Sequence, residues 1–258
     1  MASLQELQER RASECRLTPD RALESLDEAD EFLRDRGFLT LMPDSALPSL
    51  FGACHEPPYK PGARGFGAWP RTKYWWGIAL QARPGVWLPR LHAGKGLFVT
   101  EETVVLADPL CRAELSRADD GALGSDAVRL LEHLRAAGPS LLEDVKTELG
   151  LEAKAVRAVR GRLERGGALV AREVRVEATD GDHVHTTELA RWDQVVPRPV
   201  AGPAGLDELV VAGVRAAVVA PRDELRRWFS WRVDSELVER LVGDGRLAEP
   251  EEGWLCLP

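Results

Sequence analysis

Residues 125–192 read SDAVRLLEHLRAAGPSLLEDVKTELGLEAKAVRAVRGRLERGGALVAREVRVEATDGDHVHTTELARW, and capping and turn residues divide them into distinct segments. Helices are expected over residues 126–137, 141–149 and 152–165. Ser125 and Ser140 precede the first two as N-caps, and Glu143 completes a capping box with Ser140. Gly138-Pro139 and Gly166-Gly167 follow the first and third helices, because these residue types end a helix readily.

Two segments of alternating polarity come next, over residues 168–178 and 184–192. Asp180-Gly181 lies between them, and this dipeptide favours a tight hairpin turn. A helix, a helix–turn–helix and a two-stranded ribbon, in that order, are typical of a winged helix. We therefore predict a winged helix over residues 125–196.

The same plan repeats in the last part of the chain. Helices are expected over residues 206–219, 222–229 and 233–242, followed by a shorter ribbon over 246–257. The prolines and glycine between residues 197 and 203 form a linker. We predict a second winged helix over residues 204–258. The expected fold class is thus mainly α with small β-ribbons (α+β), containing tandem winged helix-turn-helix modules.

The first half of the chain is less regular. Residues 1–17 are polar and are expected to form an N-terminal tail with a frayed helix. Residues 18–115 are expected to form a helical and Trp-rich basic region, whose first helix opens at Thr18-Pro19-Asp20 and closes at Gly37. Residues 116–124 have the composition of a linker.

Length and composition exclude several classes of protein. The 258 residues suggest two or three domains, and none of their apolar runs reaches the roughly 18–20 residues that a membrane helix needs. The N-terminus lacks the apolar stretch of a secretory signal, so we expect a cytoplasmic protein. The four cysteines share no short spacing, which indicates free thiols and no zinc site. No glycine-rich phosphate loop is present, and no cofactor is expected.

The net charge of −8 by itself disfavours non-specific coating of nucleic acid. The charge is unevenly spread, however, because residues 57–100 contain seven Lys/Arg and no Asp/Glu. Eight of the sixteen aromatic residues also lie in this segment. Cations can contact phosphates and flat rings can stack on unpaired bases, so the segment is typical of a nucleic-acid surface. The alternative is that the rings form core and the cations lie on loops between them.

Three stretches carry a resemblance to a known family. They are GFLTLMP with LPSLFGA (residues 37–53), KYWWGIALQARP (73–84) and the C-terminal DELRRWFSW followed by LVERLVGDGRLAEPEEGWLCLP. In layout the chain resembles the AlkZ/YcaQ superfamily of winged-helix DNA glycosylases, and its AlkZ-related branch in particular, over roughly residues 20–258. The resemblance implies a tripartite winged-helix protein that binds duplex DNA in a positively charged cleft and excises alkylated or crosslinked bases.

In active members of that superfamily, a motif of two glutamines around an apolar residue is thought to position the attacking water. The matching place here is Leu39-Thr40-Leu41, which contains neither glutamine. Thr40 and Asp44 are the polar groups nearby and are therefore the candidate catalytic residues. Because a threonine hydroxyl is a poor substitute for an amide or a carboxylate, we expect weak or lost glycosylase activity.

Residues of three kinds are candidates for contact with double-stranded, possibly damaged DNA. The cations are Lys60, Arg64, Arg71, Lys73, Arg83, Lys154, Arg157, Arg160 and Arg172. His183 and His185 share a strand face and could touch DNA near the tip of the ribbon, with no third ligand in view for a metal. The base-stacking candidates are Trp69, Tyr74, Trp75 and Trp76. The alternative for the helix 152–165 is an ordinary solvated face.

The corresponding helix of the second module contains Asp234, Glu236 and Glu239, which would repel phosphate. We expect this helix to pack or to form a homodimer contact and not to read DNA. Two non-enzymatic alternatives remain open from the sequence. One is a transcription regulator that uses the first winged helix, and the other is a scaffold that uses winged helices for protein contacts.

Overall fold

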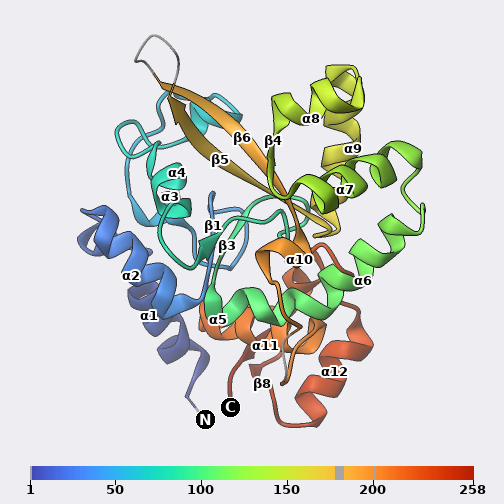
Figure 1. Cartoon of the computed structure of the whole chain (residues 1–258). Coiled ribbons are helices and arrows are strands. Elements are labelled where there is room, and N and C mark those ends of the chain that lie inside the picture. The colour runs from blue at the N-terminus through green and yellow to red at the C-terminus, as the bar shows by residue number, and fades with distance from the viewer. Residues whose placement is uncertain (1, 178–182, 200–201) are drawn as a thin grey trace.

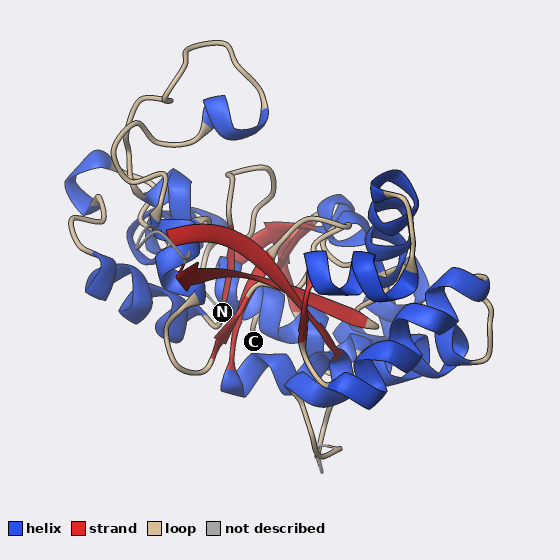
Figure 2. Cartoon of the chain, turned by 45° about the horizontal axis from the view of Figure 1, so that its top comes forward, coloured by secondary structure: helices blue, strands red, loops and turns tan. Residues whose placement is uncertain are grey.

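The computed structural model describes residues 2–177, 183–199 and 202–258 and has an α+β architecture (Figure 1). Within these residues, three small antiparallel sheets of three strands each alternate with helices along the chain. Figure 2 shows the strands crossing the middle of the molecule, with helices on either side. No helix in the described ranges is long and apolar enough to cross a membrane.

The N-terminal section builds the first sheet. Its elements are α1 (Leu4–Glu14), η1 (Pro19–Arg21), α2 (Leu26–Arg36), β1 (Phe38–Thr40), α3 (Leu50–Ala53), η2 (Gly65–Ala68), α4 (Trp76–Gln81), β2 (Val86–Trp87), β3 (Leu97–Thr100), α5 (Glu101–Val104), η3 (Val105–Ala107) and α6 (Asp108–Asp119). The strand order is β1-β3-β2, and every residue of the central strand β3 is buried.

Three expectations for this section need correction. The expected N-terminal helix is present as α1, but it is not frayed: a capping box at Ser3 stabilises its start, and Leu7 packs with Cys15 in a small apolar cluster that includes Val219. The helix expected from Thr18 is a single 3-10 turn, and α2 starts at Leu26 because the Ser25 side chain caps it. The expected linker is wrong for residues 116–119, which continue α6.

The middle section contains the predicted helices and ribbon. Its elements are α7 (Ser125–Ala137), β4 (Ser140–Leu141), α8 (Leu142–Leu149), α9 (Ala153–Arg165), β5 (Leu169–Glu177), β6 (His183–Arg191) and α10 (Trp192–Val195), with strand order β4-β6-β5. Neither Ser125 nor Ser140 is an N-cap: Gly124 precedes α7, and Ser140 lies in β4, where its hydroxyl donates to the Gly138 carbonyl. The predicted turn at Asp180-Gly181 lies outside the described residues.

The C-terminal section repeats this order. Its elements are α11 (Leu206–Ala217), β7 (Val219–Pro221), η4 (Arg222–Arg227), α12 (Ser235–Gly243), β8 (Ala248–Glu251) and β9 (Trp254–Cys256), with strand order β7-β9-β8. The predicted helices and short ribbon are present. β7 was not expected, because three residues leave no alternation in the sequence that could mark a strand.

One large apolar core runs through all three sections. Phe38 from β1, Leu131 from α7, Trp192 from α10 and Trp228 beside η4 all belong to the same cluster of buried residues. The sections therefore share a continuous core, as expected when burial of apolar surface drives their packing. A second cluster, around Leu33 and Leu80, lies within the N-terminal section.

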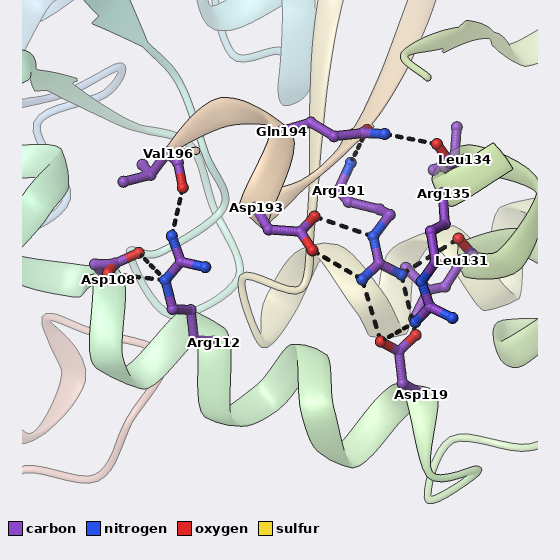
Figure 3. A network of polar contacts seen from close by, with 10 residues as sticks. All are labelled: Asp108, Arg112, Asp119, Leu131, Leu134, Arg135, Arg191, Asp193, Gln194 and Val196. Carbon is purple, nitrogen blue, oxygen red and sulfur yellow. Dashed lines mark hydrogen bonds and ion pairs between the residues drawn. The ribbon is translucent and has the colours of Figure 1, made fainter. Parts of the chain in front are cut away.

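A buried polar network joins the middle section to α6 (Figure 3). The Arg191 guanidinium donates to both carboxylate oxygens of Asp193 (3.0 and 2.9 Å) and to both of Asp119 (3.0 and 3.1 Å). It also donates to the Leu131 carbonyl of α7 at 3.3 Å. The Gln194 amide accepts from the Arg191 backbone and donates to the Leu134 carbonyl. The base of the ribbon is thereby fixed to two helices at once.

Candidate nucleic-acid interface

The outward face of α9 carries cations that have no acidic partner. Lys154, Arg157 and Arg162 are exposed, and within the described ranges none of the three forms an ion pair. Val156, Val159 and Leu163 occupy the opposite, buried face, because apolar residues at this spacing share one side of a helix. Arg160 differs, since it is half-buried and its Nε lies 3.1 Å from the Glu164 carboxylate.

A hollow of about 480 Å³ lies between α8 and α9. Its cationic lining residues are Arg90, Lys146, Arg157 and Arg160. Glu164 is almost fully buried there and is paired with Arg160 and, at 3.2 Å, with Arg90 from the N-terminal section. The ion pair of Arg90 with Glu164 therefore holds the start of the loop 90–96 against α9.

The cations and histidines of the β5–β6 ribbon are mostly paired. Arg172 lies 2.8 Å from Glu188, and His185 Nδ1 lies 3.1 Å from Glu173 across the ribbon. His183 lies in β6 opposite Glu177, and its side chain is outside the described residues. As candidate DNA contacts these residues are weaker than Lys154 and Arg157, because a phosphate would have to displace a carboxylate.

An exposed aromatic cluster forms the outer part of the Trp-rich region. Tyr59 (57% exposed), Phe66 and Tyr74 lie with their ring centroids 5.5–6.4 Å apart, and Trp69 packs against Phe66 at 5.2 Å. The cluster is held in shape by backbone hydrogen bonds such as Tyr59 N–H to the Trp69 carbonyl. Around it lie three exposed cations that make no ion pair within the described part of the chain: Lys60, Arg64 and Arg71.

Other candidates from residues 57–100 are buried or already bonded to neighbouring residues. Trp76 is only 5% exposed and belongs to the core, so it does not stack on a base, whereas its neighbour Trp75 is 46% exposed. The Lys73 ammonium donates to the Leu23 carbonyl at 2.6 Å and lies over the Trp76 ring. Arg83 forms an ion pair with Asp27. These side chains stabilise the N-terminal section and are not available for DNA.

The two candidate catalytic residues lie close together but are already bonded. Thr40 is buried, and its hydroxyl donates to the Met42 carbonyl at 2.8 Å, with the Pro48 carbonyl at 3.4 Å. It holds the turn after β1, and its proton is already donated to a backbone carbonyl. Asp44 forms ion pairs with Lys95 and, at 3.1 Å, with Nε2 of the buried His92. His92 Nδ1 donates to the Trp228 carbonyl at 2.6 Å, which anchors this group to the C-terminal section.

The contacts of Asp44 predict how the thermal stability of the protein changes at acidic pH. Burial acts to raise the pKa of its carboxyl, but the hydrogen bond from Lys95 and the charges of His92 and Lys95 outweigh it, so the pKa lies below the ordinary 3.8. A group with a lowered folded-state pKa stabilises the fold fully above its unfolded-state pKa, and this contribution is lost as the pH falls through the folded-state value. Thermal melts between about pH 2 and 5 should show a weaker pH dependence for Asp44→Asn. The same pH dependence of the melting temperature for the wild-type protein and for Asp44→Asn would contradict a lowered pKa of Asp44.

Sequence reasoning missed a second group of cations. Arg226 and Arg227, the last residues of η4, and Arg232, which follows it, are exposed and line a hollow of about 830 Å³. The stretch RRWFSWR (residues 226–232) places these arginines around aromatic residues that the fold buries or half-buries. Arginines on both sides of aromatic residues were the sequence feature that could have indicated this cationic surface.

No known family model, curated protein or solved structure matches this chain. The resemblance to the AlkZ/YcaQ superfamily therefore stays a prediction from sequence motifs. What the chain does must be inferred from its element order and from the charges on its surface.

Proposed function

We propose that this protein binds DNA through a winged-helix unit over residues 125–196, with α9 as the helix that contacts the duplex. The element order α7-β4-α8-α9-β5-β6 is the order of a winged helix, and α11-β7-η4-α12-β8-β9 repeats it over residues 204–258. The observation that carries the proposal is the set of exposed cations on α9, Lys154, Arg157 and Arg162, which form no ion pair within the described residues, because such cations suit a phosphate backbone.

The aromatic cluster gives this interface a second element. Tyr59, Phe66 and Tyr74 present ring faces or edges at the surface, with Lys60 and Arg64 beside them. Exposed rings beside cations bind unpaired bases by stacking while the cations hold the backbone. The cluster thus supports binding of DNA that contains unpaired or extruded bases.

We do not extend the proposal to base excision. The Thr40 hydroxyl already donates to a backbone carbonyl, and Asp44 is held between Lys95 and His92. A glycosylase requires a group that is free to orient water against the sugar, and neither residue is free in this arrangement.

The test is duplex binding measured by fluorescence anisotropy as a function of salt. Lys154→Ala/Arg157→Ala should reduce the slope of log K against log salt by about 2 and weaken binding by about tenfold at moderate salt, because two phosphate contacts are lost. The loss should be similar on unrelated sequences, which would disfavour a base-reading regulator. Arg215→Ala, an exposed arginine of α11, is the control. Absence of wild-type binding at about 50 mM salt would refute the proposal and favour a protein-interaction scaffold.

A further inference from the structure

The cations at the end of η4 and just after it, Arg226, Arg227 and Arg232, line a hollow that is rich in positive charge. Its lining contains Arg222, Arg226, Arg227 and Arg232 against Asp223 and Asp234. Arg222 is paired with Glu249 and Glu239, so its charge is already matched. In the part of the chain that the structure describes, Arg226, Arg227 and Arg232 form no ion pair.

A second hollow, of about 370 Å³, adjoins the first and shares Arg226 and Arg227 with it. Lys95 enters its lining from the other side, together with His92. The two acidic residues here are already bonded: Glu224 accepts from the Ala46 backbone N–H at 2.7 Å, and Asp44 is paired with Lys95 and His92. Arg226 and Arg227 thus extend the positive surface toward the loop that contains Lys95.

That loop connects the second hollow to α9. Arg90, at its start, lines the hollow between α8 and α9 and pairs with Glu164. Gly94 lies directly against the Arg165 side chain, since a Cβ on Gly94 would stand 2.9 Å from Arg165 Cγ. Ser230, just after η4, donates its backbone N–H to the Leu91 carbonyl and its hydroxyl to the Arg90 carbonyl. Residues 90–96 therefore contact both α9 and the segment that follows η4.

We propose that the exposed cations of α9 and Arg226, Arg227 and Arg232 form one track for a nucleic-acid phosphate backbone, joined by the loop that contains Lys95, whose own charge is already paired with Asp44. The inference rests on the proposed function. It adds the second winged-helix unit, residues 204–258, to the same DNA-binding surface. Cations distributed over adjoining hollows suit a chain of phosphates better than a single small anion, which would need one closed pocket. The second unit contributes η4 to this surface and not α12, whose exposed face contains Glu236 and Glu239.

The experiment uses the full chain, a duplex of about 25 base pairs and a salt titration. Arg226→Ala/Arg227→Ala should reduce the slope of log K against log salt by about 2, which makes the loss of affinity between about 50 and 200 mM salt roughly tenfold smaller. Combined with Lys154→Ala/Arg157→Ala, the two reductions should add to about 4, because both pairs contact the same DNA. Arg226→Lys/Arg227→Lys should keep the wild-type slope, since lysine retains the charge, and Arg215→Ala should also leave it unchanged.

The outcomes separate the two proposals. If the wild-type protein binds and Lys154→Ala/Arg157→Ala weakens binding, but Arg226→Ala/Arg227→Ala leaves affinity and slope unchanged, the track is refuted and the proposed function stands. If the wild-type protein does not bind duplex at low salt, both fail. Competition by inorganic phosphate at millimolar concentration, with no change in the salt slope of the alanine variant, would point to a single-anion site and overturn the track. Arg226 and Arg227 are exposed, and unchanged thermal melts of the variants would exclude loss of folding as the cause.

Discussion

Replacing Arg191 by methionine should lower the free energy of unfolding by about 2–4 kcal/mol, because a largely buried cation is removed from two partly buried carboxylates. The Arg191 side chain is only 4% exposed and neutralises Asp119 and Asp193 together. Burial acts to lower the pKa of the guanidinium, but its hydrogen bonds to Asp193 and Asp119 outweigh this and raise the pKa. In a chain of this size the melting temperature should fall by about 10 °C, as measured by calorimetry.

Two further variants check that this loss comes from unpaired charge. Arg135→Met also removes a cation from Asp119, but the Arg135 side chain is 54% exposed, so its cost should stay below about 1 kcal/mol. Arg191→Met/Asp119→Asn/Asp193→Asn should recover part of the loss, because no partly buried carboxylate is then left without the Arg191 guanidinium. A single Arg191→Met variant as stable as the wild-type protein would show that the network does not hold the ribbon to α6.

Replacing Trp228 by alanine should cost about 3–5 kcal/mol, the range for truncating a buried aromatic side chain. Trp228 is fully buried, and Gly213 leaves room for it: a Cβ on Gly213 would stand 3.0 Å from the indole ring. Its backbone carbonyl accepts from His92 and is unaffected by the substitution, so the loss reports on side-chain packing alone. Chemical denaturation with an unchanged slope against denaturant is the measurement.

Trp228→Phe is the matched control. The indole N–H of Trp228 is buried and has no acceptor within the described structure, so removing it relieves a cost of about 1–3 kcal/mol. This gain should offset much of the lost volume, and we expect a change below about 1.5 kcal/mol. The Trp228 side chain is fully buried and Arg226 and Arg227 are exposed, so the variant should also keep wild-type DNA binding. A loss as large as that of alanine would mean that the indole N–H has a partner.

Local patterns in the sequence were sufficient for most of the secondary structure. Helix periodicity and the terminating glycines placed α7, α8 and α9 within a few residues, and alternation placed β5 and β6. Errors occurred where a cap was chosen from residue type alone, as at Ser140, which pairs in a sheet with Leu189. That pairing joins residues far apart in the chain, and no local pattern encodes it.

The candidate interface was predictable only in part. The acid-free charge of residues 57–100 and the cations of the helix 152–165 could be read directly, because composition and spacing are properties of the chain itself. Exposure could not be read in this way. Trp75 and Trp76 are neighbours of the same type, yet one is half exposed and the other is core, since a helix turns adjacent side chains to different faces.

The sequence by itself determined the order of helices and strands and the uneven distribution of charge, since both depend on interactions between near neighbours. The tertiary structure alone decided which cations lie together. In the folded chain, Lys73 donates to the Leu23 carbonyl and Arg83 pairs with Asp27. Arg226 and Arg227, in contrast, line the same hollow as Lys95. The physical reason is that packing of the shared apolar core, and not the adjacent residues, brings the loop 90–96 against both α9 and the segment after η4.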